Sequence, residues 1–114
     1  MATRNVNPRK AIHQIVEAIR LAVNPTLIIL FGSQAGGGAN PDSDVDLLVV
    51  EDAPFGSNRS RRQETVRIMK AISEFPMPVD LLLYSRDEVE HWRHSVNHVV
   101  GRAFKEGLVV YERP

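Results

Sequence analysis

Two apolar segments joined by a glycine-rich loop constrain the fold of this chain most strongly. Residues 27–31 (LIILF) and 45–50 (VDLLVV) are rich in branched aliphatic side chains, and short apolar runs of this kind predict buried β-strands. The segment between them, residues 32–43, carries four glycines and one proline and predicts a loop. The two strands are therefore close enough in sequence to pair directly, which favours a mixed sheet over a purely parallel one.

The rest of the chain alternates helical and strand patterns. We expect helices at residues 7–23, 57–75, 85–95 and 96–105, and further strands at residues 79–85 and 108–112, the last at a sheet edge. On the second helix the expected buried face consists of Val66, Ile68, Met69, Ile72 and Phe75. Ser85 and Glu88 have the spacing of a capping box, and Gly107 is expected to end the last helix at the C′ position. This order predicts an α/β (α+β) fold, a small mixed sheet of about four strands flanked by helices, as one domain over residues 1–114.

Composition and charge narrow the range of functions. The 114 residues include 14 Lys and Arg and 14 Asp and Glu, so no net charge draws the chain to nucleic acid or an anionic membrane. The absence of cysteine excludes disulfides and thiolate metal sites and fits a reducing compartment. The apolar runs are far shorter than the roughly 20 residues that cross a bilayer, and no signal-peptide pattern is visible. We expect a cytoplasmic protein that binds any polyanion through local chemistry.

Three aspartates mark the starts of two predicted strands. Asp44 and Asp46 precede and open the second strand, and because side chains alternate, both point to one face with α-carbons about 6.5–7 Å apart. Asp80 occupies a similar place in the strand at residues 79–85. If these strands are neighbours, the three carboxylates converge and suit one or two Mg²⁺ ions and phosphoryl transfer. The alternative is structural: solvated carboxylates at a strand end, with Asp80 capping a turn.

Gly32 and Ser33, after the first strand, indicate an anion site. Glycine lets the backbone approach a ligand closely, and a helix that starts at Ser33 would direct N–H groups and a hydroxyl at a phosphate. Other motifs fail on spacing. A P-loop would need Lys followed by Ser or Thr from Gly38 onward. A dinucleotide-binding fingerprint would need glycine at Pro41, and an EF-hand loop would need glycine at Leu47.

The stretch FGS, ten further residues, DVD and an aspartate in a later strand together resemble the signature of the nucleotidyltransferase superfamily, Gly-Ser-x10-Asp-x-Asp. More closely, the chain resembles the minimal nucleotidyltransferases of prokaryotes, short proteins that are often encoded beside a helical HEPN partner. The resemblance extends from the first predicted helix to the terminal EGLVVYE. It implies the nucleotidyltransferase fold.

The resemblance also implies roles for individual residues. Asp44 and Asp46 would bind Mg²⁺, with two ions in the site, and Gly32 and Ser33 would hold the phosphates of ATP. Asp80 would act as general base on the acceptor hydroxyl or as a ligand of the second ion. The implied reaction transfers AMP from ATP to a hydroxyl, such as a tyrosine of a HEPN toxin, so that the protein acts as an antitoxin. Either a homo-oligomer or a hetero-oligomer with that partner is compatible with these roles.

One segment departs from the family pattern. Relatives commonly carry an Arg-Ala-Arg-Gly-like run after Gly-Ser, whereas this chain has Gln34-Ala35-Gly36-Gly37. Two cations for the triphosphate are missing, and each charge-assisted bond would contribute roughly 1.5–3 kcal/mol. Arg59, Arg61 or Arg62 could replace them from the next loop and helix. The alternative function is a binding module of the same fold that neutralises its partner by complex formation, with weak or absent catalysis.

The segment HWRHSVNH at residues 91–98 carries histidines at spacings found in metal sites. In a chain without cysteine we interpret these histidines as polar surface, and Trp92 as a packing residue. Arg93 and His98 imitate the ribonuclease motif of HEPN proteins, but the predicted strands contradict that all-helical fold. We therefore expect no nuclease site in this segment.

Overall fold

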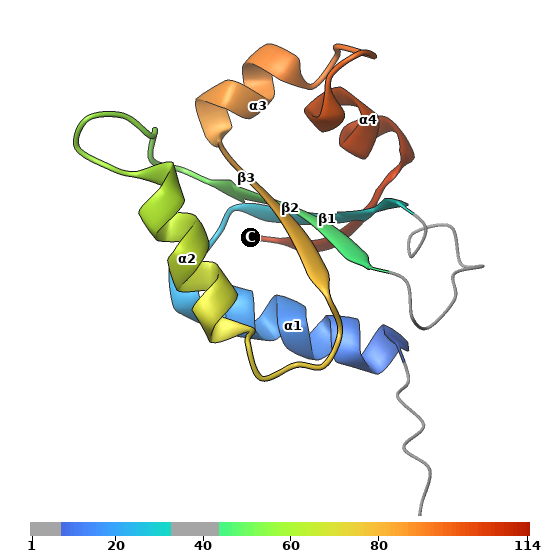
Figure 1. The fold of residues 1–114 in the computed structure, drawn as a ribbon. Coiled ribbons are helices and arrows are strands. Elements are labelled where there is room, and N and C mark those ends of the chain that lie inside the picture. The colour runs from blue at the N-terminus through green and yellow to red at the C-terminus, as the bar shows by residue number, and fades with distance from the viewer. Residues whose placement is uncertain (1–7, 33–43) are drawn as a thin grey trace, which may run out of the picture.

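The four predicted strands form one sheet, flanked by four helices, in a computed structural model that describes residues 8–32 and 44–114. In chain order the elements are α1 (Pro8–Val23), β1 (Leu27–Phe31), β2 (Val45–Glu51), α2 (Arg61–Ala71), β3 (Val79–Ser85), α3 (Arg86–Trp92), α4 (Val99–Glu106) and β4 (Leu108–Glu112). Figure 1 shows α1 and α2 on one face of the sheet and α3 and α4 on the other. Within the described ranges, no helix combines the length and the apolar character that crossing a bilayer requires. The predicted α+β fold is confirmed.

The strand order in the sheet is β3-β2-β1-β4. β1 pairs antiparallel with both β2 and β4, whereas β2 pairs parallel with β3. The consecutive strands β1 and β2 pair directly, as predicted, and α2 provides the crossover that a parallel pair needs. The predicted edge position of the last strand is also confirmed, because β4 lies outermost beside β1.

Alternation along β1 and β2 divides the core into two clusters. The cluster on the α1–α2 face includes Ile15, Ile19, Ile28, Leu30, Val45, Leu47, Val49, Ile68 and Ile72. The cluster on the α3–α4 face includes Ile29, Leu48, Val50, Val89, Val100 and Ala103. Because Asp46 lies between Val45 and Leu47, its side chain belongs to the α3–α4 face.

The second helix is shorter than the sequence predicts, and its buried face is narrower. It begins at Arg61 rather than at residue 57, because Gly56 and Arg59 exchange backbone hydrogen bonds of 2.9 and 3.2 Å in a tight turn. Ser60 then caps the helix by accepting a hydrogen bond from the Gln63 N–H. Two of the residues expected to be buried, Ile68 and Ile72, are buried, and Phe75 packs against the cluster on the α1–α2 face. Val66 and Met69 are 46% and 38% exposed, because they lie on another side of the helix from Ile68.

The last two helices are also shorter than predicted. Ser85 Oγ accepts a hydrogen bond from the Glu88 N–H (3.3 Å), and Glu88 Oε1 accepts one from the Ser85 N–H (2.8 Å), which confirms the capping box. α3 ends at Trp92, and α4 begins only after His98, whose Nδ1 caps it by accepting from the Val100 N–H (3.1 Å). Trp92 stacks on His98 with ring centroids 4.2 Å apart. The packing role of Trp92 is confirmed, but His98 is a structural cap rather than polar surface.

Gly107 ends α4, but not in the left-handed C′ conformation that the sequence predicts. Its φ of −86° and ψ of 175° are extended. Glycine is needed there for space, since a Cβ atom would lie 2.5 Å from Ile29 Cγ2 and 2.6 Å from the Ala103 carbonyl oxygen. The absence of a side chain therefore lets the end of α4 approach β1 closely.

Gly101 provides a test of this packing. A Cβ atom there would lie 1.9 Å from the Ser95 carbonyl oxygen, which is backbone and cannot rotate away. We expect Gly101→Ala to lower the free energy of unfolding by about 1–3 kcal/mol, the range for overpacking. Gly56→Ala is the matched control, because nothing lies within 4 Å of its added Cβ atom. Urea unfolding of both variants measures the difference, and equal stabilities would contradict the close packing of α4.

Candidate active site

Asp46 and Asp80 stand side by side where β2 and β3 begin. The two strands are parallel, and the register pairs Asp46 directly with Asp80. Their side chains therefore leave the sheet on the same face, the one covered by α3 and α4. Asp46 is half-buried and Asp80 is exposed. The sequence places both residues near strand starts, and the structure shows that these starts are adjacent.

The electrostatics of Asp46 depend on the two other predicted carboxylates. Burial raises the pKa of Asp46 above its usual value, and the charge of Asp80, a side-chain hydrogen bond to Asp80 and the charge of Asp44 raise that pKa further. Asp44 is exposed and lies just before β2. Because the charges of two neighbouring carboxylates disfavour the ionised form of Asp46, a cation bound beside Asp46 would be stabilised.

Gly32 brings the end of β1 against this group. The residue before it, Phe31, pairs with Asp46 across the antiparallel ladder. A Cβ atom on Gly32 would lie 2.2 Å from Asp46 Oδ2, and the φ of Gly32 is +74°, a conformation that favours glycine. Backbone and carboxylate therefore meet where the sequence predicts a phosphate site. Ser33, the other predicted phosphate ligand, lies outside the described residues, as do Gln34 and Gly36.

The chemistry of these donors fits a hard divalent cation. All are carboxylate oxygens, the ligand type that Mg²⁺ prefers, and Mg²⁺ commonly takes only one or two carboxylates together with water and phosphate oxygens. The close approach of Gly32 to Asp46 Oδ2 and the raised pKa of Asp46 agree with such an ion. In the part of the chain that the structure describes, no group of three or more Asp, Glu, His or Cys side chains is placed so that it could hold a metal ion.

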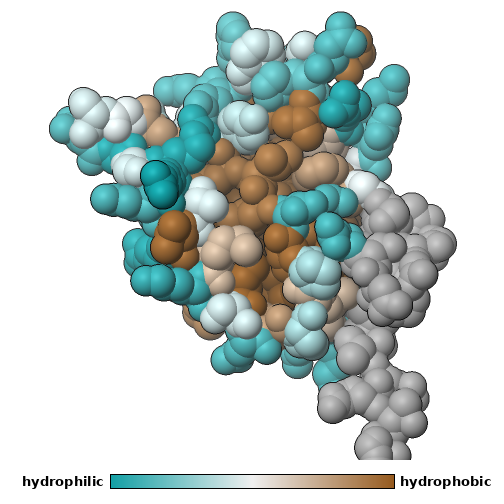
Figure 2. Space-filling view, in the orientation of Figure 1, coloured by the Kyte–Doolittle hydropathy of each residue, from teal (hydrophilic) through white to brown (hydrophobic). Residues whose placement is uncertain are grey.

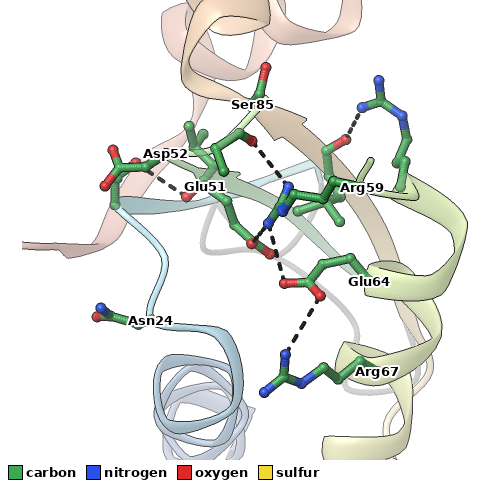
Figure 3. A network of polar contacts seen from close by, with 12 residues as sticks. Asn24, Glu51, Asp52, Arg59, Glu64, Arg67 and Ser85 are labelled. Carbon is green, nitrogen blue, oxygen red and sulfur yellow. Dashed lines mark hydrogen bonds and ion pairs between the residues drawn. The ribbon is translucent and has the colours of Figure 1, made fainter. Parts of the chain in front are cut away.

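The arginines suggested as substitutes for the missing cations lie far from the aspartates, and two of the three are held in ion pairs. Arg59 pairs with Glu51 and lies 3.4 Å from Glu64, as Figure 3 shows. Arg61 Nη1 donates to the Leu83 carbonyl oxygen (2.6 Å), and its guanidinium pairs with Glu88. These contacts lie at the ends of β2 and β3, whereas the aspartates lie at their starts. Arg62 follows Arg61 in the first turn of α2, at that same distant end.

Sequence reasoning missed a buried carboxylate in this network. Glu51 is only 4% exposed at the end of β2, and its Oε2 is buried without a hydrogen-bond partner among the described residues. Burial, and then the neighbouring Glu64, raise the pKa of Glu51 to about 7, although Arg59 opposes that shift. Its position directly after an apolar run was the available signal. Glu51 therefore helps to hold the loop before α2 and is not part of the aspartate group.

Comparison with known proteins assigns the family. The family model of the nucleotidyltransferase domain matches residues 12–109. This chain therefore belongs to the nucleotidyltransferase domain family, which confirms the prediction from the Gly-Ser and Asp-x-Asp pattern.

The relatives are consistent with that assignment. A Methanocaldococcus jannaschii protein, provisionally named a protein adenylyltransferase, is 40% identical over 52 residues, which are 44% of this chain and 52% of that protein. The chain thus matches about half the length of this curated relative. A provisionally assigned nucleotidyltransferase from Sulfolobus solfataricus has a TM-score of 0.57 at 23% identity, covering 91% of this chain and 79% of its own.

Two further solved structures come from toxin–antitoxin complexes. A chain of a toxin–antitoxin complex with AMP-PNP has a TM-score of 0.55 at 21% identity, covering 95% of this chain and 75% of its own. A chain from the complex of a tri-AMPylated Shewanella oneidensis HEPN toxin with its MNT antitoxin has a TM-score of 0.53 at 18% identity, covering 94% and 74%. At these identities the likeness establishes the fold.

The raised pKa of Glu51 predicts a pH dependence of stability. The unfolded chain releases this proton near pH 4.5, whereas the folded chain keeps it to about pH 7. Between these values the folded state binds more protons, so the contribution of Glu51 to stability falls as pH rises. Glu51→Gln removes this titration. We expect the stability of the wild type relative to Glu51→Gln to decrease from pH 5 to pH 8, by the order of 1–3 kcal/mol.

Urea unfolding at several pH values measures this difference. The matched control is Glu90→Gln, since Glu90 is an exposed carboxylate of α3 that pairs with Arg93 on the surface. Its difference from the wild type should change little over the same range. A constant or rising stability difference for Glu51→Gln would show that Glu51 is ionised in the folded protein at pH 5.

Proposed function

We propose that this chain transfers AMP from ATP to a hydroxyl acceptor in a Mg²⁺-dependent reaction. The observation that carries the proposal is the register of β2 and β3, which sets Asp80 beside Asp46, together with the contact of Gly32 against Asp46. Membership of the nucleotidyltransferase domain family supports the class of reaction. A relative crystallised with AMP-PNP supports an adenosine triphosphate as the nucleotide.

In this proposal each residue has a separate task. Asp44 and Asp46 hold Mg²⁺, with two ions in the site, while Gly32 and Ser33 bind the phosphates of ATP. When bound, Mg²⁺ would neutralise the phosphate charge that builds up during transfer. Asp80 either accepts the proton of the acceptor hydroxyl or completes the second ion's coordination.

In the proposed step, one bond forms and one bond breaks at the α-phosphorus of ATP. The acceptor oxygen attacks the α-phosphorus and forms the new oxygen–phosphorus bond. The bond from the α-phosphorus to the bridging oxygen breaks, and pyrophosphate leaves with that electron pair. In the version with Asp80 as base, the hydroxyl proton passes to its carboxylate. Positioning of the two reactants at one strand edge and charge neutralisation supply most of the rate.

We further propose that the acceptor is a tyrosine of a HEPN-type toxin and that the chain acts as its antitoxin in the cytoplasm. The support is the fold shared with a chain of the complex of a tri-AMPylated HEPN toxin and its MNT antitoxin. The provisional name of the M. jannaschii relative, a protein adenylyltransferase, agrees with a protein acceptor.

A second candidate is a binding module that neutralises the same partner without efficient catalysis. Two observations favour it. Gln34 and Gly36 stand where relatives commonly carry basic residues. Arg59 and Arg61 do not compensate, because Glu51 and Glu88 hold them at the far ends of β2 and β3. The paired aspartates favour the enzyme, and experiment can separate the two.

The deciding experiment incubates the protein with labelled ATP, Mg²⁺ and the proposed HEPN-type partner protein. We expect label on the partner, and at least about a hundredfold less transfer from the Asp44→Ala/Asp46→Ala double variant. Asp87→Asn is the matched control, because Asp87 is an exposed acid in the first turn of α3 and should leave transfer unchanged. No transfer by the wild type, with full neutralisation by the double variant, would support the binding module instead.

Asp80→Asn separates the proposed base from a turn cap. If Asp80 takes the proton, this variant should bind a non-hydrolysable ATP analogue about as tightly as the wild type yet transfer AMP at least about a hundredfold more slowly. Calorimetric titration gives the nucleotide affinity, and single-turnover labelling gives the rate. Unchanged transfer would leave Asp80 with a structural role only.

A further inference from the structure

We propose that the open edge of β3 beside Asp80 binds an extended segment of the acceptor polypeptide as an additional strand. This inference rests on the proposed function, since it concerns how a hydroxyl reaches Asp80. β3 is the outermost strand on its side of the sheet. In Figure 1 it lies in front, with α2 on one side and α3 and α4 on the other.

The hydrogen bonds of the sheet fix which backbone groups of β3 point outward. The Pro78 carbonyl oxygen accepts a hydrogen bond from the Val45 N–H (2.9 Å), so residue 78 faces β2. Because backbone groups alternate along a strand, residues 80, 82 and 84 also face β2. Residues 79, 81, 83 and 85 therefore direct their N–H and C=O groups away from the sheet.

One half of this edge is already closed. The Leu83 carbonyl oxygen accepts a hydrogen bond from Arg61 Nη1 (2.6 Å), and the Ser85 N–H donates to Glu88 Oε1 (2.8 Å). Arg61 and Glu88 also pair with each other. They thereby cover the end of the strand that is distant from the aspartates, in the way that proteins commonly protect exposed strand edges.

The other half of the edge has no paired strand among the described residues. Within residues 8–32 and 44–114, no strand lies beyond Val79 and Leu81 to pair with their outward groups. These two residues flank Asp80 directly. A strand bound there would present alternate side chains to the two faces of the sheet, one face being that of the Asp80 carboxylate. A hydroxyl side chain on that face would lie beside the proposed base.

The surface around this edge suits the apolar side chains of such a segment. Figure 2 shows apolar surface gathered over β3, between α2 and the α3–α4 layer. Val79, Leu81, Leu82 and Tyr84 of β3 are only half-buried. Main-chain hydrogen bonds would provide affinity with little sequence preference, and this apolar surface would select the flanking side chains.

The occupant that fits is a short acceptor segment rather than a second copy of this chain. Two copies joined through β3 would need a longer free edge, but Arg61 and Glu88 close the half at Leu83 and Ser85. The open half matches a segment of about three residues centred on the acceptor side chain. Its position at Asp80 is where an acceptor must be delivered for the proposed transfer.

Amide hydrogen exchange by NMR tests the docking directly. The probe is the peptide acetyl-Lys-Thr-Val-Tyr-Val-Thr-Lys-amide, added at millimolar concentration with Mg²⁺ and a non-hydrolysable ATP analogue. We expect exchange of the Val79 and Leu81 amides to slow by about tenfold or more, as new main-chain hydrogen bonds form. Unchanged exchange, or slowing confined to β4, would overturn the proposal.

Two N-methylated forms of the peptide sharpen the result on the unaltered protein. Methylation of alternate amides removes donors from one side of a strand only. One methylated form should abolish the slowing of amide exchange at Val79 and Leu81, and the other should preserve it. The form that preserves the slowing also reveals the orientation of the bound segment. Equal effects from both forms would overturn strand addition.

Two variants test the edge from the protein side. Leu81→Pro removes an outward N–H that β2 does not use, while Leu81→Ala removes the side chain and keeps the N–H. We expect the peptide to slow exchange of the Val79 amide in Leu81→Ala but not in Leu81→Pro. Measurements of nucleotide affinity and thermal unfolding will show that the nucleotide site and the fold of Leu81→Pro persist. Equal protection in both variants would contradict the proposal.

The outcomes separate this inference from the proposed function. Protection of Val79 and Leu81 without AMP transfer to any tyrosine supports the docking and overturns the reaction. AMP transfer to the partner with no protection at these amides, and with equal rates for the two Leu81 variants, supports the reaction and overturns the docking.

Discussion

The parallel pairing of β2 with β3 is the constraint on which the rest of the structure depends. Its register sets Asp46 opposite Asp80, and the same register sets Glu51 opposite Ser85 at the other end. A slip of one residue would turn Asp80 to the opposite face of the sheet and bury it against the α1–α2 cluster. The apolar residues between these ends therefore do more than stabilise the core, because they hold the proposed site in register.

The two ends of this strand pair have opposite electrostatic character. At the starts, the charges of Asp44 and Asp80 raise the pKa of Asp46, and Gly32 lets the backbone approach the Asp46 carboxylate, an arrangement suited to a cation and a phosphate. At the far ends, Arg59 and Arg61 are matched with Glu51 and Glu88 and stack near aromatic rings, Arg59 over Phe55 at 4.2 Å. Arg59 and Arg61 therefore support the fold at this end, away from the aspartates.

Much of the fold and part of the candidate site could be predicted from the sequence, for physical reasons that differ between residues. Strand positions followed from apolar runs, and the adjacency of the first two strands followed from the short loop between them. The sequence predicted that Asp80 lies beside Asp46 only if their two strands are neighbours. Periodicity shows which face of a strand a side chain takes, but it does not show which strands are neighbours. The late start of α2 depended on the Gly56–Arg59 turn, and the cap at His98 depended on a side chain that patterns treat as ordinary surface.

We propose that Asp46 and its neighbours form one site for a cation and a nucleotide, and Mn²⁺ binding tests this most directly. Electron paramagnetic resonance can follow Mn²⁺ uptake in the presence of a non-hydrolysable ATP analogue. The account predicts that Asp46→Asn weakens Mn²⁺ binding by about tenfold or more, while Asp87→Asn, on the first turn of α3, leaves it unchanged. Equal Mn²⁺ affinity in the wild type and Asp46→Asn would contradict the account.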